Sequence, residues 1–218
     1  MTLTLFAHPF SSYCQKVLMA LWENDTPFTY RHMEEPGAGE DLARLWPIKK
    51  FPVLVDGDRT VIETSIIIEY LDQHHPGEVR FLPGEAAAGL EVRLLDRFFD
   101  QHVMNAAQVA VNESLRQKPD RLDEARQSAA QALEIAYGWL EQRLGGRAWA
   151  AGDQFSLADC AAAPSLFYAD WVHLIDDATY PRLRAYRTRL LARPSFARAV
   201  EEGRKYRSYF PLGAPDRD

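Results

Sequence analysis

The sequence predicts a small α/β domain with a mixed four-stranded sheet, followed by an all-α domain. Strand patterns of period two alternate with helix patterns up to Glu63, and beyond it apolar residues recur only at helical spacing. Between the two halves, residues 77–84 contain two glycines and a proline, which is typical of a linker. We therefore expect a first domain over residues 1–76, a linker over 77–85 and a helical domain over 86–218.

The first domain is expected to begin with a βαβ unit. Residues 2–6 alternate polar and apolar side chains and predict a strand, and a helix pattern follows to about Glu23. Residues 28–33 alternate in the same way and predict a second strand. Two strands joined by a helix pair in parallel through a right-handed crossover.

A hairpin and a further helix complete the predicted βαβ-ββα domain. After a short helix over 41–46, residues 47–63 predict a hairpin with Asp56-Gly57 at the turn position. Thr64 or Ser65 can cap the next helix, which is expected to end near His74 because Pro76 and Gly77 cannot continue it. The sheet is therefore expected to contain four strands.

The second half of the chain predicts helices only. Ser156 and Asp159 have the spacing of a capping box, in which each side chain binds a free N–H at the helix start. Pro164 is expected to kink the helix that follows. The remaining helices are expected over 90–102, 122–140, 181–191 and 195–205.

The composition excludes several classes of function. The formal net charge is -6 and no basic run resembles a phosphate-tracking patch, so we expect no nucleic-acid partner. No apolar run approaches the ~20 residues that span a bilayer, and no secretory signal is visible, so we expect no membrane partner. The two cysteines lie in different settings, which favours a reducing, cytoplasmic location over a disulfide framework.

Motifs for metals and nucleotides are absent from the sequence. The six histidines show no spacing typical of a metal site, so no metal cofactor is expected. The sequence has neither a glycine-rich phosphate loop nor a Gly-x-Ser-x-Gly elbow. These absences argue against nucleotide binding and against the usual serine hydrolases.

The junction of the first strand and first helix, residues 7–17, is the candidate reaction centre. Ser11 or Ser12 lies there at a helix N-terminus, where free N–H groups and the helix dipole stabilise an anion such as a thiolate. Taken alone, this stretch is explained more simply by a serine that only caps the helix, a contact worth about 1 kcal/mol. Further landmarks are needed to assign chemistry.

Four landmarks in order resemble the glutathione transferase family. They are Ser11 to Val17, Lys50 to Leu54 around Phe51-Pro52, Glu63 to Leu71, and Phe155 to Asp159. The resemblance covers nearly the whole chain and is closest to serine- and cysteine-type, bacterial-like cytosolic enzymes. It implies a thioredoxin-like first domain, an all-helical second domain that holds an electrophile, and a homodimer.

The resemblance also implies residue roles, with glutathione as co-substrate. Ser11 would hydrogen-bond the glutathione thiol, which must become a thiolate to react. The tripeptide would be held by residues of the first domain: Lys50 or Lys49 at the glycyl carboxylate, Phe51 and a cis Pro52 at the cysteinyl backbone, and Glu63 and Thr64 at the γ-glutamyl end. Phe51 and Thr64 stand where the family usually has valine and serine.

Several alternatives stay open at the thiol position. Phe6 and Ala7 occupy the place of the catalytic tyrosine of tyrosine-type transferases, so a tyrosine mechanism is unsupported. Ser12 is a rival to Ser11 for the thiol contact. Cys14 takes the second position of a Cys-x-x-Cys motif, but without a first cysteine we interpret it as a small buried side chain.

The expected function is conjugation of glutathione to a hydrophobic electrophile. Alternatives are a glutathione-dependent thiol reductase or lyase that uses Cys14, and a non-catalytic module that binds glutathione or a protein. The final segment, 206–218, either folds over the pocket or frays. The residues expected to line the electrophile pocket are Phe10, Tyr13, Phe99, His102, Asn105 and Tyr168.

Overall fold

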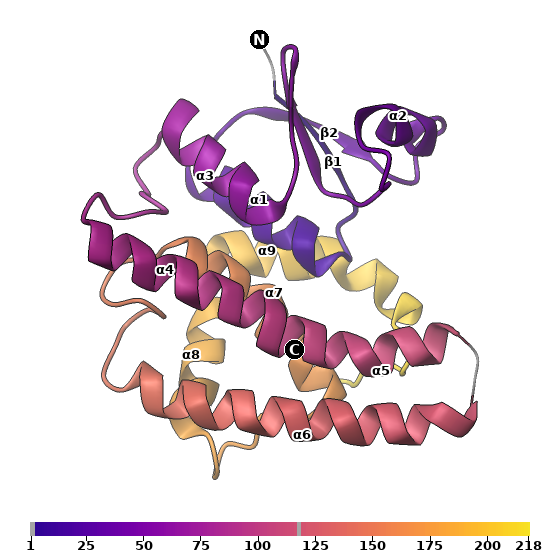
Figure 1. The fold of residues 1–218 in the computed structure, drawn as a ribbon, viewed down its shortest axis with the longest axis vertical. Helices are drawn as coiled ribbons and strands as arrows, with labels where there is room; N and C mark the ends of the chain where they lie inside the picture. Colours follow the sequence, from indigo (N-terminus) through magenta and orange to yellow (C-terminus); the bar gives the residue numbers. More distant parts are fainter. Residues whose placement is uncertain (1–2, 117–118) are drawn as a thin grey trace.

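The N-terminal domain is built on a mixed sheet with strand order β2-β1-β3-β4 (Figure 1). The computed structural model describes residues 3–116 and 119–218, so Thr2, expected in the first strand, lies outside the described residues. β1 (Leu3–Ala7) pairs in parallel with β2 (Phe28–His32) and antiparallel with β3 (Val53–Asp56), which pairs antiparallel with β4 (Arg59–Val61). The predicted four-stranded mixed sheet is confirmed.

Three helices accompany the sheet, and the rest of the chain is helical. α1 (Ser12–Glu23) is the βαβ crossover, followed by α2 (Ala38–Leu45) and α3 (Thr64–His74). Within the described ranges no strand follows β4, which agrees with the predicted all-helical second half. Its elements are α4 (Ala86–Phe98), the π-helix η1 (Phe99–Met104), α5 (Asn105–Leu115), α6 (Pro119–Leu144), α7 (Leu157–Val172), α8 (Pro181–Leu191), α9 (Pro194–Gly203) and the 3-10 helix η2 (Arg204–Tyr209).

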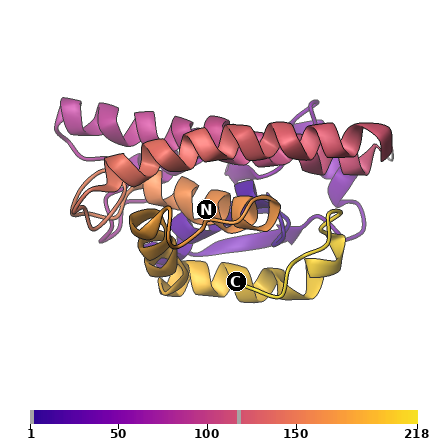
Figure 2. The same cartoon turned by 90° about the horizontal axis from the view of Figure 1, so that it is seen from below.

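The helical domain has α7 at its centre. Figure 2 shows α7 between the layer of α4, α5 and α6 and the layer of α8 and α9. Every residue of α7 from Leu157 to Trp171 is buried, and residues on both sides of Pro164 are helical. Of the helices in the described ranges, none combines the length and apolarity needed to cross a bilayer.

The capping box predicted at the start of α7 is present. The Ser156 N–H and hydroxyl both donate to Asp159 Oδ2 at 2.9 Å. Asp159 Oδ1 accepts from the Ala150 N–H at 2.9 Å and from the Tyr186 hydroxyl at 2.6 Å. This buried carboxylate therefore joins the preceding loop and α8 to the start of α7.

Three details of the first domain differ from the sequence predictions. Asp56 pairs with Arg59, so the turn of the hairpin is Gly57-Asp58, one residue later than expected, and Gly57 takes the positive φ of 59° that this turn requires. Asp56 stays in the strand because its carboxylate accepts from the Tyr70 hydroxyl at 2.9 Å and from His75 Nε2 at 2.7 Å.

The start of α3 is the second difference. Its N-cap is Glu63, and neither Thr64 nor Ser65 caps the helix. Ser65 is used elsewhere, because its hydroxyl donates to Asp96 Oδ2 of α4 at 2.7 Å. Ser65, predicted as a possible cap at the start of this helix, thus connects the two domains instead. The short helix α2 also begins three residues before the expected Asp41.

A buried ionic cluster joins the two domains beneath α1. The Lys16 ammonium lies 2.6 Å from Asp96, 2.7 Å from Asp100 and 3.1 Å from the Ser65 hydroxyl, and its side chain is 1% exposed. Burial raises the pKa of Asp100, while Lys16 opposes that shift. The four residues come from α1, α3, α4 and η1, so the cluster fixes the N-terminal domain on the helical domain.

We predict that Lys16→Met lowers the free energy of unfolding by about 3–5 kcal/mol, because it leaves two buried carboxylates without their cation. Urea unfolding measures this change. Arg44→Met is the control, since Arg44 is 72% exposed in its pair with Asp41 and such pairs contribute about 0–1 kcal/mol. Equal, small losses in both variants would contradict the prediction, and adding Asp96→Asn and Asp100→Asn to Lys16→Met should restore part of the stability.

Candidate functional site

The turn from β1 to α1 is held by hydrogen bonds on every side. The Ser11 N–H donates to the His8 carbonyl at 3.0 Å, which closes a four-residue turn. Inside the turn, the Phe10 N–H donates to His8 Nδ1 at 3.2 Å. Gln15 Nε2 donates to the Pro9 carbonyl at 2.8 Å, and the Tyr168 hydroxyl donates to the Phe10 carbonyl at 3.0 Å. The position of Ser11 is therefore fixed by both domains.

Ser11 is the N-cap of α1. Its Oγ accepts from the Cys14 N–H at 3.4 Å, and its carbonyl accepts from the Gln15 N–H at 2.9 Å. Because Oγ acts as an acceptor in this cap, its hydroxyl hydrogen is available to a second group. No acidic residue lies in the first turn of α1, so the positive end of the helix dipole is not neutralised locally. Ser12 is the first residue of the helix proper.

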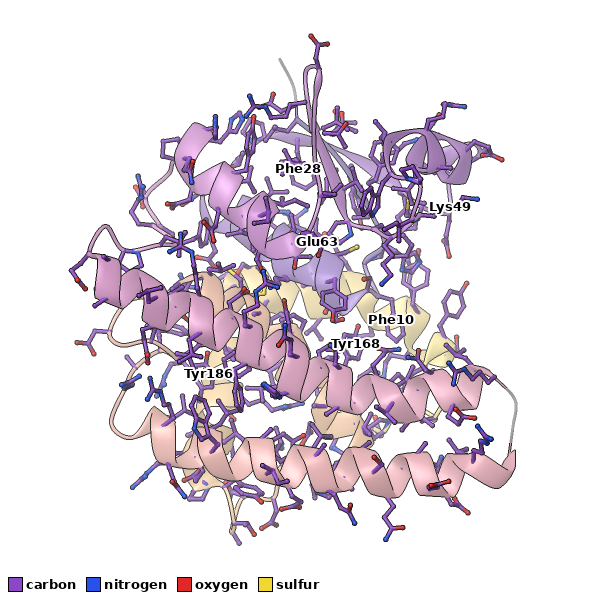
Figure 3. All side chains as sticks on the ribbon, in the orientation of Figure 1. Phe10, Phe28, Lys49, Glu63, Tyr168 and Tyr186 are labelled. Atoms are coloured by element: carbon purple, nitrogen blue, oxygen red, sulfur yellow. The ribbon has the colours of Figure 1, made fainter. Side chains whose placement is uncertain are left out.

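Ser11 faces an apolar cavity of about 250 Å³ between the two domains. Phe10 and Tyr168 form one wall with their rings edge to face, 5.5 Å apart, and Figure 3 shows them next to each other below Glu63. None of the lining side chains is acidic or basic. The lining residues are Phe10, Ser11, Ser12, Tyr13, Met104, Ala107, Gln108, Val111, Leu115, Tyr168, Val172, Tyr209, Phe210 and Pro211.

The C-terminal segment folds over this cavity. Tyr209, Phe210 and Pro211 line it, and the Phe210 ring lies 5.1 Å from Trp171. The Ser114 hydroxyl of α5 donates to the Pro211 carbonyl at 3.1 Å and attaches the segment from the other side. Of the two arrangements considered for residues 206–218, the structure has the one in which the segment covers the pocket.

The residues expected in the electrophile pocket divide into three groups. Phe10, Tyr13 and Tyr168 line the cavity, whereas Asn105 lies on the exposed groove that also holds His102 and accepts from the Tyr13 hydroxyl at 3.2 Å. Phe99 is fully buried in the core and is not part of the lining. His102 lies on an exposed groove together with Phe98 and Trp139. The expectation of Phe99 and His102 as pocket residues is therefore corrected.

The two corrections have different causes. Phe99 follows the buried Leu95 and Asp96 at α-helical spacing, so its side chain faces the core. Residues 99–104 form the π-helix η1, which changes the angular register, so that Val103 and Met104 are buried while His102 is exposed. Apolar periodicity alone gave no sign of this change. Met104 and the adjacent Ala107 supply the cavity wall instead.

The residues expected to hold a tripeptide lie at the edge of the first domain. The Phe51–Pro52 bond is cis, as the family resemblance implied, and Phe51 is 36% exposed while Pro52 is buried. Lys50 is exposed in the loop before β3. Glu63 is exposed at the N-cap of α3 with φ of 67°, a conformation that costs a residue other than glycine about 1–3 kcal/mol. Thr64 follows it as the first, buried residue of α3.

Tyr13 and Cys14 are both poor candidates for an ionised group. Burial, together with the negative charges of Asp100 and Glu63, raises the pKa of Tyr13 to about 12, so its hydroxyl stays protonated at neutral pH. Cys14 is fully buried and accepts from the His8 N–H at 3.4 Å, and burial raises the pKa of its thiol to about 12. The structure places the Cys14 thiol in the core, away from solvent.

Sequence spacing missed a cluster at the ends of β1 and β2. The ligand-type atoms of His8, His32 and Glu34 lie within 4.8 Å of one another, which is compatible with a metal site. However, both imidazoles accept a backbone N–H at Nδ1, from Phe10 and from Glu34 respectively. In a neutral histidine this leaves the hydrogen on Nε2, which then cannot also offer a lone pair to a metal. The hydrogen bonds of the cluster therefore favour a protein-only network.

Family models match both halves of the chain. One described as glutathione S-transferase, N-terminal domain, matches residues 5–79, and one described as glutathione S-transferase, C-terminal domain, matches residues 98–194. The two models match in the order of the two domains seen in the structure.

Individual relatives are similar over nearly their full length. The chain is 30% identical over 212 residues to a probable maleylacetoacetate isomerase of Vibrio cholerae, covering 93% of this chain and 97% of that protein. It is 27% identical over 203 residues to a stringent starvation protein A homolog of Haemophilus influenzae, covering 92% and 91%. A glutathione S-transferase of Methylobacterium radiotolerans, solved in complex with glutathione sulfonate, is 29% identical with a TM-score of 0.73, covering 92% and 95%. The chain therefore belongs to the glutathione S-transferase family.

Proposed function

We propose that the protein is a transferase that conjugates the thiolate of glutathione to a hydrophobic electrophile. The observation that carries this proposal is the position of Ser11, whose hydroxyl caps α1 and lines an apolar cavity between the domains. A relative of 29% identity was solved with glutathione sulfonate, which supports glutathione as the thiol substrate. We also propose a cytoplasmic location.

Residues of the first domain would hold the tripeptide. The exposed backbone of Phe51 before Pro52 offers hydrogen-bonding groups to the cysteinyl unit, and the exposed Lys50 ammonium suits the glycyl carboxylate. Glu63 and Thr64 at the start of α3 suit the γ-glutamyl end, since a carboxylate pairs with its ammonium and free N–H groups bind its carboxylate. In the proposed complex, a tripeptide held in this way would present its thiol to Ser11.

The proposed chemical step depends on the thiolate. A free thiol with a pKa of about 8.5 is only a few per cent ionised at neutral pH. The Ser11 hydroxyl can donate to the sulfur while its Oγ accepts from the Cys14 N–H, and the dipole of α1 favours the anion. The sulfur then forms a bond to carbon of the electrophile, and a halide leaves or an epoxide oxygen takes a proton from solvent.

The two alternatives differ in how well the structure supports them. A reductase or lyase that uses Cys14 needs an accessible thiolate, and Cys14 is buried with a raised pKa. A non-catalytic binding module needs the same glutathione site without turnover. Retention of wild-type protein on immobilised glutathione, with no activity on aryl halides, epoxides or peroxides, would favour the binding module.

A homodimer is part of the proposal because apolar side chains are exposed on neighbouring faces of α3 and α4. The bidentate pair of Arg93 with Glu69 joins these helices at 2.8–2.9 Å. Ile66 precedes Glu69 by three residues and Leu90 precedes Arg93 by three, so these two lie near the pair, and Leu94 lies one turn after Leu90 on the same face of α4. Their exposed fractions are 49%, 68% and 51%, which suits contact with a second copy.

We predict that Ser11→Ala lowers kcat/KM for glutathione conjugation by roughly ten- to a hundredfold, because a hydrogen bond to a charged group contributes about 1.5–3 kcal/mol. A panel of aryl halides measures the effect. Ser12→Ala is the matched control, since Ser12 lines the same cavity without capping α1, and it should retain most activity. The opposite ranking of the two variants would assign the thiol contact to Ser12.

Cys14 and Cys160 should resist alkylation in the folded protein, because both thiols are fully buried and burial raises the pKa of each. Mass spectrometry after iodoacetamide treatment at about pH 8, slightly below the ordinary thiol pKa, should find no adduct without denaturant and two adducts in it. Rapid labelling of Cys14 in the folded state, with loss of activity in Cys14→Ala, would instead support the reductase alternative.

The dimer prediction concerns the exposed leucines of α4. Leu94→Glu places a charge in the proposed interface and should convert a species of twice 24.8 kDa into one of 24.8 kDa, measured by sedimentation at micromolar concentration. Leu174→Glu is the control, because Leu174 is also exposed, at 48%, but lies in the loop after α7. A wild-type protein that sediments as a monomer would contradict the dimer directly.

A further inference from the structure

We propose that His8 is a positioning residue whose neutral imidazole holds the turn that presents Ser11, and that protonation of this ring releases the turn. The inference rests on the proposed function for its link to activity, but the state of the ring can be measured without any substrate. His8 does not touch the cavity, so its effect would pass through Phe10 and Ser11.

His8 occupies the first position of the turn and binds its third residue. The His8 carbonyl accepts from the Ser11 N–H at 3.0 Å, and His8 Nδ1 accepts from the Phe10 N–H at 3.2 Å. Asparagine and aspartate stabilise turns in the same way, with a side-chain oxygen that accepts from the N–H two residues later. Pro9 suits the second position, which needs no N–H donor. The imidazole thus fixes the backbone immediately before the N-cap.

The contacts of the ring define its tautomer. Because Nδ1 accepts from Phe10, the neutral ring carries its hydrogen on Nε2, which lies 3.4 Å from Glu34 Oε1. The same carboxylate accepts from the Tyr206 hydroxyl at 3.1 Å, and Tyr206 lies 3.3 Å from His32 Nε2. The neutral ring therefore satisfies one donor and one acceptor, and a second ring hydrogen would have no acceptor at Nδ1.

The groups around His8 come from three elements. His32 and Glu34 lie at the end of β2, Cys14 lies in α1, and η2 contributes Lys205, Tyr206 and Tyr209. Burial lowers the pKa of His8, the nearby His32 and Lys205 lower it further, and the Glu34 carboxylate raises it without overcoming burial. The lowered pKa of His8 agrees with the hydrogen-bond geometry, since both favour the neutral ring.

Protonation would place two hydrogens against each other. The new hydrogen on Nδ1 would point at the Phe10 N–H, which would lose its acceptor, and the turn would no longer be closed by the side chain. The Ser11 hydroxyl would then lose its fixed position relative to the cavity. The ring of Tyr206 also packs on His8, with centroids 4.6 Å apart. Protonation of His8 would therefore also alter a contact of the segment that leads to Tyr209 and Phe210.

The sign of the pH effect follows from the lowered pKa. A histidine whose pKa is lowered by folding is neutral in the folded state at neutral pH, and its contribution to stability is lost as pH falls below its ordinary value. The pH profile of kcat/KM should therefore have an acid limb from protonation of His8, in addition to the limb from protonation of the glutathione thiol. Replacing His8 by a group that accepts but does not titrate should remove the first limb and keep the second.

Three variants test the inference through the pH profile of kcat/KM. His8→Asn keeps an acceptor near the position of Nδ1 and should keep activity within about threefold of wild type at about pH 8, while losing the limb due to His8. His8→Phe removes the acceptor and should lower kcat by about tenfold or more with KM for glutathione little changed, because misplaced groups affect the chemical step. His74→Asn, an exposed histidine of α3, is the matched control and should keep both limbs.

Long-range proton–nitrogen NMR correlations of the imidazoles provide the substrate-independent arm. The imidazole signal that disappears in His8→Asn belongs to His8, and it should show the Nε2–H tautomer and a midpoint of titration below the ordinary value for histidine. The Phe10 and Ser11 amide signals should shift with the same midpoint. An Nδ1–H tautomer, or equal loss of activity in His8→Asn and His8→Phe, would overturn the proposal. If wild type lacks transferase activity but the NMR result holds, the proposed function fails and the structural role of His8 survives.

Discussion

The buried contact of Lys16 with Asp96 and Asp100 is the constraint on which the geometry between the domains depends. A cation and two carboxylates in the core are stable only when their positions match closely, because an unpaired buried charge costs several kcal/mol. α1 therefore cannot slide along α4 and η1. Since Ser11 begins α1, the same contact fixes where an anion at this helix start lies relative to the cavity wall on α5 and α7.

The turn before α1 shows how both domains contribute to one position. Hydrogen bonds from Gln15 and Tyr168 hold its carbonyls, while His8 holds its N–H groups. Tyr168 belongs to α7, the most buried helix of the second domain, and is also a wall of the cavity. A residue of the cavity wall is thus directly connected to the backbone that presents Ser11, the proposed thiolate ligand.

Much of the fold follows from local patterns, whereas parts of the site do not. The strands, the capping box of Ser156 and Asp159, and the helix starting at the candidate serine are each set by a few neighbouring residues, and the structure confirms them. Phe99 differs from its prediction because apolar spacing shows that a side chain faces inward, but not whether it meets the core or a cavity. His102 differs because the π-helix turns the buried face of the helix away from it. The surroundings of His8 could not be predicted for another reason: Glu34 and Tyr206, which contact its ring, are distant in sequence and meet it only in the folded chain.

The cavity wall formed by residues 209–211 lies in a different part of the chain from the proposed glutathione site. The proposed glutathione site uses the loop before β3 and the start of α3, where the buried Pro52 and Thr64 anchor it in the first domain. The opposite wall of the cavity comes from Tyr209, the last residue of η2, and from Phe210 and Pro211 after it. Ser114 holds this segment by donating to the Pro211 carbonyl, and Tyr209 is 60% exposed. Under the proposed function, replacement of residues 209–211 would change the shape of the cavity and leave the proposed contacts to glutathione in the first domain in place.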